Sequence, residues 1–98
     1  MTRSEAIAKF EGCAPAVRAR GATSLYLFGS SARDEARPDS DLDLFIDYDP
    51  ATRFSLVDLA AIQNLLEERL TAKVDLTTRD SLHPRLRESI TRTAVRVF

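Results

Sequence analysis

Segment 25–47 constrains the fold of this chain more than any other part of its sequence. An apolar run ends at Gly29-Ser30, a polar connection follows, and a second apolar run begins beside Asp41 and Asp43. Because successive side chains of a strand point to opposite faces, the two carboxylates share one face and the intervening apolar residues take the other. The pattern predicts two strands that place a pair of acids on one face of a sheet.

Two neighbouring carboxylates indicate a cation. Unit charges about 4 Å apart repel by roughly 1 kcal/mol in water and about 4 kcal/mol in a partly buried setting. A divalent ion would relieve this repulsion, and hard oxygen ligands suit Mg²⁺ or Mn²⁺. Gly29 lets a phosphate approach the backbone, and amides at the start of a helix that follows would attract the anion. Together these features predict a metal–nucleotide site.

Length, composition and charge narrow the class of protein. We expect residues 1–98 to form one domain, because this length supports a single core. The 44% hydrophobic and 30% charged content is that of an ordinary soluble globular protein. A net charge of -1 argues against non-specific binding of nucleic acid, which needs a basic surface. Cys13 is the only cysteine and no apolar run approaches the ~20 residues of a membrane span, so we expect a cytoplasmic protein without a membrane partner.

Capping residues and apolar spacing predict the helices. Thr2 and Glu5 have the form of a capping box, and Ser55 can cap a long helix whose apolar stripe should face the sheet. Further helices are expected at 15–20, from Ser30 to about Glu35, and from Pro84 onward. In the last of these, we expect a buried stripe that consists of Leu86, Ile90 and Ala94.

Alternation of apolar and polar residues predicts the strands. They should cover residues 24–28, 42–48 and 73–77, with a loop at 36–40 and a short extended segment at 95–98. The expected architecture is therefore α/β (α+β): a small mixed sheet, helices packed on one side, and an open face that carries the acids.

The motifs resemble those of the polymerase-β-like nucleotidyltransferases. That family has Gly-Ser, a short gap, Asp-x-Asp, and a third carboxylate on a neighbouring strand, which Gly29-Ser30, Asp41, Asp43 and Asp75 match. The short length and the flanking text LYLFGSSAR and LHPRLRESI resemble the minimal nucleotidyltransferases, or MNT proteins, over nearly the whole chain. Many relatives have glycine where this sequence has Asp34; the acids are untouched, so we expect activity to be retained.

The resemblance implies a role for each acid of the motif. Asp41 and Asp43 would coordinate one or two Mg²⁺ ions, with Mn²⁺ as an alternative, which also hold the nucleoside triphosphate. Asp75 would complete the set, holding a metal or accepting the proton of the attacking hydroxyl. The competing interpretation is a pair of solvated acids at the start of a strand and an edge-strand acid that faces water.

The nucleotide itself would be held by the glycine turn. Gly29 would admit the phosphates, and Ser30 would donate its hydroxyl or amide to one of them. Arg33, one turn beyond, could reach the triphosphate. The alternatives are a plain strand-to-helix turn with Ser30 as an N-cap, and a surface ion pair between Arg33 and Asp34 or Glu35.

The remaining polar candidates are interpreted as structural. Asp39, Asp47 and Asp49 are expected to be solvated, His83 to cap a helix, and the arginines of the last segment to form a solvated surface. Cys13 is expected to pack as a small hydrophobic residue.

Many MNT proteins are antitoxins encoded beside HEPN-domain ribonucleases. The resemblance therefore implies Mg²⁺-dependent transfer of AMP from ATP to a hydroxyl of a HEPN-type toxin, with tyrosine as the expected acceptor. Two alternatives stay open. One is an antitoxin that neutralises its toxin by binding alone, and the other is a transferase that acts on a small-molecule or RNA acceptor.

Overall fold

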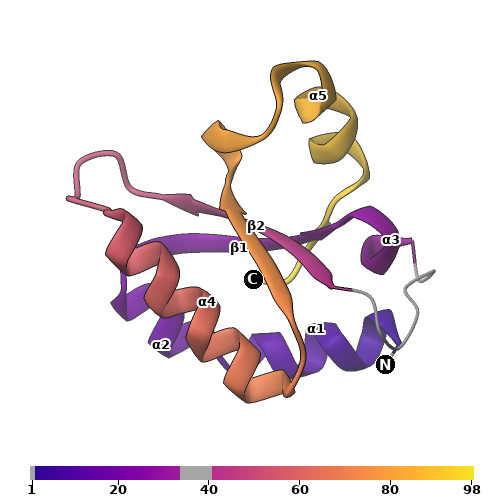
Figure 1. Ribbon diagram of the computed structural model, residues 1–98, viewed down its shortest axis with the longest axis horizontal. Helices are drawn as coiled ribbons and strands as arrows, with labels where there is room; N and C mark the ends of the chain where they lie inside the picture. The colour runs from indigo at the N-terminus through magenta and orange to yellow at the C-terminus, as the bar shows by residue number, and fades with distance from the viewer. Residues whose placement is uncertain (1, 34–40) are drawn as a thin grey trace.

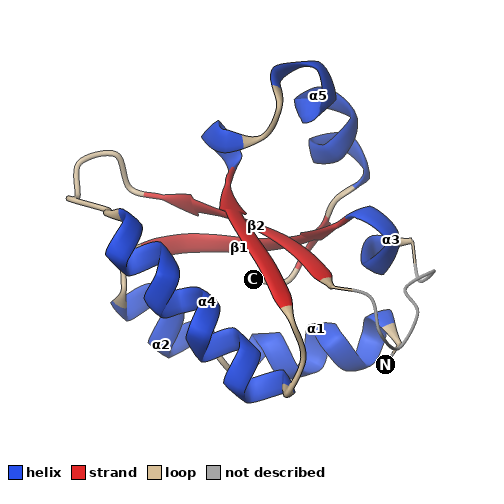
Figure 2. Ribbon diagram, in the orientation of Figure 1, coloured by secondary structure: helices blue, strands red, loops and turns tan. Residues whose placement is uncertain are grey.

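A computed structural model, which describes residues 2–33 and 41–98, contains a mixed four-stranded sheet (Figures 1 and 2). The strand order is β3-β2-β1-β4. Strand β1 pairs antiparallel with both β2 and β4, whereas β2 and β3 run parallel. The strands are β1 (Ala22–Phe28), β2 (Leu42–Tyr48), β3 (Val74–Thr78) and β4 (Val95–Arg96). The predicted fold class is confirmed.

Five α-helices and one 3₁₀ turn connect these strands in the described part of the chain. They are α1 (Arg3–Glu11), α2 (Ala14–Ala19), α3 (Gly29–Ala32), α4 (Leu56–Leu70), η1 (Arg79–Ser81) and α5 (Pro84–Thr93). Helices α1, α2 and α4 lie together on one side of the sheet, and α5 stands on the other (Figure 1). Not one described helix combines the length and the apolar character needed for a membrane crossing.

Both predicted capping boxes are present and explain where α1 and α4 begin. The Thr2 Oγ1 accepts from the Glu5 backbone N–H at 3.1 Å, and the Thr2 N–H donates to Glu5 Oε1 at 3.3 Å. Ser55 and Asp58 form the same reciprocal pair at the start of α4. These bonds satisfy amides that a helix start leaves without intrahelical partners.

The core lies between the sheet and the three helices packed on it. Apolar residues alternate along the strands, so one face of the sheet is continuously hydrophobic. Fully buried side chains from both layers include Phe10, Val17, Leu25, Leu27, Leu44, Ile46, Ile62 and Leu66. Cys13 is buried beside them, as predicted.

Helix α5 departs from the prediction. Leu86 is 55% exposed, Ile90 is only half-buried, and no residue of this helix is buried. Ala94 is not part of the helix but follows it as the C-cap. The expected buried stripe is wrong, because α5 stands on the side of the sheet opposite the main core (Figure 1).

Other differences concern element ends. Strand β1 begins at Ala22 rather than residue 24, β3 covers Val74–Thr78 rather than 73–77, and α3 begins at Gly29 rather than Ser30. The predicted loop at 36–40, together with Asp34, Glu35 and Asp39, lies outside the described residues.

Candidate active site

Two of the three predicted acids lie side by side in the sheet. Asp43 and Asp75 are directly opposite each other in the parallel register of β2 and β3. Neighbouring strands are about 4.8 Å apart, so the two residues begin from adjacent positions on the face turned away from the core. Asp41 precedes β2 by one residue and is exposed, as is Asp75, whereas Asp43 is half-buried. The face predicted for Asp43 and Asp75 is the one observed.

Gly29 lies directly against this pair. It follows the last residue of β1, Phe28, which is the register partner of Asp43. Its φ is +69°, and a Cβ built on it would lie 2.7 Å from Asp43 Oδ2. Both the backbone angle and the contact favour glycine here. The glycine turn and the acid of the second strand are thus a single structural unit.

The electrostatics of the site are dominated by Asp43. Partial burial, and then the neighbouring carboxylates of Asp75 and Asp41, raise the pKa of Asp43 above its ordinary value. Each of these causes disfavours the charged form. A cation bound at this position would remove the penalty.

These residues fit a hard divalent cation in donor type and in charge. Carboxylate oxygens are the ligands that Mg²⁺ and Mn²⁺ prefer. Within residues 2–33 and 41–98, however, no three His, Cys, Asp or Glu side chains already form a group that could hold a metal ion. Asp41 and Asp75 are both exposed, so packing does not restrict their side chains to one rotamer.

The nucleotide-binding candidates surround the same turn. Ser30 is half-buried in α3, and Arg33 is the exposed C-cap residue of that helix. Helix α3 has four residues, so its start offers individual amides rather than the dipole of a long helix. Next to Ser30, Ser31 is 3% exposed, and its Oγ has no hydrogen-bond partner among the residues that the structure describes.

A cluster of aromatic rings continues along the face that carries the acids. Phe45 is fully buried there, with Tyr26 stacked on it at 4.8 Å and Phe28 at 5.8 Å between ring centroids. The guanidinium of Arg79 lies over Tyr26 and Phe45, 5.0 and 4.9 Å from their centroids. The face that was predicted to be open is therefore partly covered.

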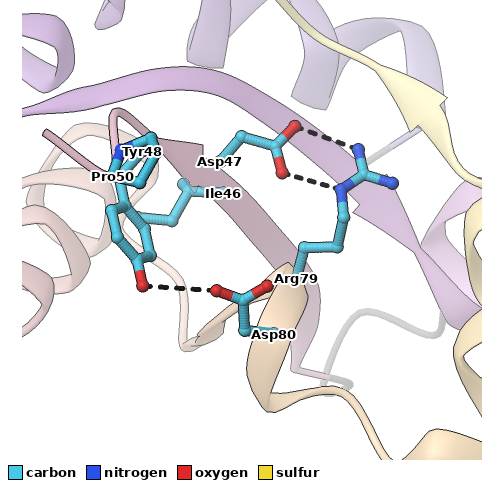
Figure 3. A pocket seen from close by; sticks show the side chains of 6 residues that line it. All are labelled: Ile46, Asp47, Tyr48, Pro50, Arg79 and Asp80. Carbon is cyan, nitrogen blue, oxygen red and sulfur yellow. Dashed lines mark hydrogen bonds and ion pairs between the residues drawn. The ribbon is translucent and has the colours of Figure 1, made fainter.

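Arg79 is fixed in this position by Asp47 (Figure 3). Its Nε and Nη2 donate to the two carboxylate oxygens at 2.7 and 3.0 Å. The prediction that Asp47 is a solvated acid is wrong, because its side chain forms this bidentate ion pair. No local signal in the sequence indicates this pair, because Arg79 lies in η1, beyond the end of β3, where strand alternation no longer applies.

Comparisons with known proteins show the family of this chain. A family model described as a nucleotidyltransferase domain matches residues 12–97. A protein of Methanocaldococcus jannaschii, provisionally named a protein adenylyltransferase, is 36% identical over 84 residues, which cover 86% of this chain and 88% of that protein.

Solved structures of nucleotidyltransferases have the same fold as this chain. One that is provisionally named a minimal nucleotidyltransferase has a TM-score of 0.83 and 37% identity, covering 97% of this chain and 95% of that one. A chain in the structure of the tri-AMPylated Shewanella oneidensis HEPN toxin in complex with MNT antitoxin also matches. Its TM-score is 0.62, and the match covers 90% of this chain and 68% of the matched chain. At 19% identity, this second likeness concerns the fold alone.

Proposed function

The chain belongs to the family of nucleotidyltransferase domains, and from this membership we propose that it transfers AMP from ATP to a hydroxyl group of a partner protein. The observation that carries the proposal is the register of Asp43 with Asp75 beside Gly29. An enzyme of this type must hold a triphosphate next to clustered acids, and Asp43 and Asp75 are neighbours across β2 and β3 with Gly29 against Asp43.

Gly29 and Ser30 hold the phosphates in this proposal. The absence of a side chain at Gly29 lets the Asp43 carboxylate lie against the turn, so a cation held by Asp43 would draw the phosphates toward the amides of the turn. The Ser30 hydroxyl is a further donor, and Arg33 lies one turn away as a cationic contact. Arg3 stabilises the turn, because its Nη1 donates to the carbonyl of Ala32 at 3.0 Å.

Asp41, Asp43 and Asp75 hold the metal. One or two Mg²⁺ ions, when bound, supply charge neutralisation at the α-phosphate and at the departing pyrophosphate. Asp43 is positioned by its strand and by Gly29, and it repels its neighbours until a cation is present. Asp75, which is exposed on the edge strand β3, would orient the attacking hydroxyl or accept its proton.

The acceptor is proposed to be a separate protein, a HEPN-type toxin that this chain silences as an antitoxin. Two observations support it: the Methanocaldococcus relative is named for adenylyl transfer to protein, and the Shewanella complex contains an AMP-modified HEPN toxin. Tyrosine is the proposed acceptor residue, because its phenol becomes a nucleophile once its proton is removed.

A labelling experiment tests this function. The chain is incubated with α-labelled ATP, Mg²⁺ and the HEPN-type protein encoded beside it, and label on that protein is measured. Label should be transferred by the wild type and by Glu11→Gln, which removes an exposed charge on the opposite side of the sheet. It should be lost with Asp41→Ala plus Asp43→Ala. Equal neutralisation of the toxin by the double variant, without label, would instead support neutralisation by binding alone.

A further inference from the structure

A pocket lies at the far end of β2 from the acids. It has a volume of about 270 Å³ and is lined by Ile46, Asp47, Tyr48, Pro50, Arg79 and Asp80 (Figure 3). Asp47 lies four positions after Asp43 along β2, which is roughly 13 Å at about 3.3 Å per residue. Pockets for small ligands usually measure roughly 300–1,000 Å³, so this one suits a single side chain better than a nucleotide.

The pocket carries one carboxylate, that of Asp80, which no described cation neutralises. Arg79 forms its bidentate pair with Asp47, so these two lining charges cancel. Asp80 is exposed and has no ion pair in the part of the chain that the structure describes. Its Oδ2 accepts from the hydroxyl of Tyr48 at 3.2 Å, which leaves the other carboxylate oxygen available to a ligand. The lining therefore has a net charge of -1 and favours a cation.

The walls of the pocket are fixed before any ligand arrives. The Tyr48 ring stacks on Phe54, with centroids 4.9 Å apart and an interplanar angle of 13°. Arg87 donates from Nη2 to the backbone carbonyls of Asp80 and Leu82 at 2.9 and 3.3 Å, and so holds η1 in place. A preformed site loses less conformational entropy on binding than a mobile one.

We propose that this pocket receives a lysine or arginine side chain of the acceptor protein, an inference that rests on the proposed function. The aliphatic part of that side chain would lie against Tyr48 and Pro50, and its cationic end would pair with Asp80. Anchored there, the partner lies about 13 Å along the strand from Asp43, so one fixed contact orients its hydroxyl toward the acids.

The surroundings of Tyr48 favour a protein over a free small molecule as the occupant. Tyr48 also lines an adjoining hollow of about 200 Å³ together with Leu56 and Leu59. Leu56 is 83% exposed and the next residue, Val57, is 73% exposed. A folded partner that places a basic side chain in the pocket can cover these apolar groups, which a single amino acid cannot reach.

The first experiment measures the charge preference of the pocket without using catalysis. N-acetyl-arginine amide and N-acetyl-glutamine amide are titrated into the full chain, and amide chemical shifts are followed by NMR. The arginine probe should shift Tyr48 and Asp80, and Asp80→Asn should abolish the response, since asparagine keeps an acceptor for Tyr48 but loses the charge. Glu11→Gln should respond like the wild type. No shift, or equal shifts with both probes, would overturn the proposal.

The second experiment measures transfer kinetics with the partner protein. Asp80→Asn should raise the KM for the partner about three- to fivefold, as expected for one exposed ion pair, and Asp80→Lys should raise it further through like-charge repulsion. Values of kcat and of KM for ATP should stay unchanged. A change in the KM for ATP, or an unchanged KM for the partner with Asp80→Lys, refutes the anchor. If the wild type transfers no label although the arginine probe binds, the proposed function fails and the anchoring role fails with it, while the charge preference stands.

Discussion

Replacing Gly29 with alanine should disturb the geometry of the site more than the stability of the fold. The new Cβ would lie 2.7 Å from Asp43 Oδ2, whereas ordinary contacts begin at 3.4 Å, so the carboxylate must move by roughly 0.7 Å. The displaced atom is the end of a side chain, so the clash itself costs little stability. The φ of +69° adds strain of about 1–2 kcal/mol for a residue with a Cβ. For a domain of this size, that lowers Tm by about 5–15 °C.

The loss of activity should be much larger than the loss of stability suggests. Misplacing a reacting group by about 1 Å can cost roughly 100-fold, so the rate of label transfer by Gly29→Ala should fall about 10- to 100-fold at a temperature where the protein is folded. Circular dichroism gives Tm, and initial rates of AMP transfer give activity.

Gly21→Ala is the matched control. Gly21 has a φ of +109°, and its Cβ would meet Phe54 Cδ1 at 3.2 Å, far from the acids. It should lower Tm to a similar extent and leave the transfer rate at saturating partner concentration unchanged. A wild-type rate for Gly29→Ala, with the Tm loss seen in Gly21→Ala, would refute the contact between the glycine turn and Asp43 as a requirement for activity.

Three further predictions follow from individual contacts. Because the pKa of Asp43 is raised in the folded protein, the free energy of unfolding falls as pH rises above the ordinary value of 3.8. Asp43→Asn should therefore raise the Tm of the metal-free protein at pH 7 and not at pH 3.5. An equal gain at both pH values would contradict this. Arg79→Ala removes an ion pair and two cation–π contacts and should lower the free energy of unfolding in urea by about 1–2 kcal/mol. In a double-mutant cycle, the losses caused by Arg79→Ala and Asp47→Asn should not be additive. Full additivity would show that the ion pair contributes nothing. Ser55→Ala removes the cap of α4 and should cost about 1 kcal/mol, whereas Asn64→Ala in the exposed middle of the helix should cost nothing.

Features fixed by neighbours in sequence were predictable. The bounds of β2 match the prediction because Leu42, Leu44 and Ile46 recur at every second position and Asp49-Pro50 ends the strand. Both capping boxes depend on residues three positions apart, so their side chains meet whenever the helix forms. Alternation in β2 likewise turns Asp43 away from the core, whereas Asp41 lies just before the strand.

Features that depend on distant segments were not predictable to the same degree. Alternation places Asp75 on the correct face, but only the register of β2 and β3 sets it directly opposite Asp43. The Arg79–Asp47 pair joins residues 32 positions apart, and no local sequence pattern at either residue predicts this contact. In α5, the spacing of Leu86 and Ile90 indicates an apolar stripe correctly, but no local rule says that it lies outside the core.

The position of the transferred phosphorus tests the account most directly. The wild-type chain, Mg²⁺ and the HEPN-type partner are incubated in parallel with ATP labelled at the α- or the γ-phosphate. We expect label on the partner only from α-labelled ATP, with release of pyrophosphate, and none with Asp43→Asn. Label from γ-labelled ATP, or undiminished α-label with Asp43→Asn, would contradict nucleotidyl transfer by these acids.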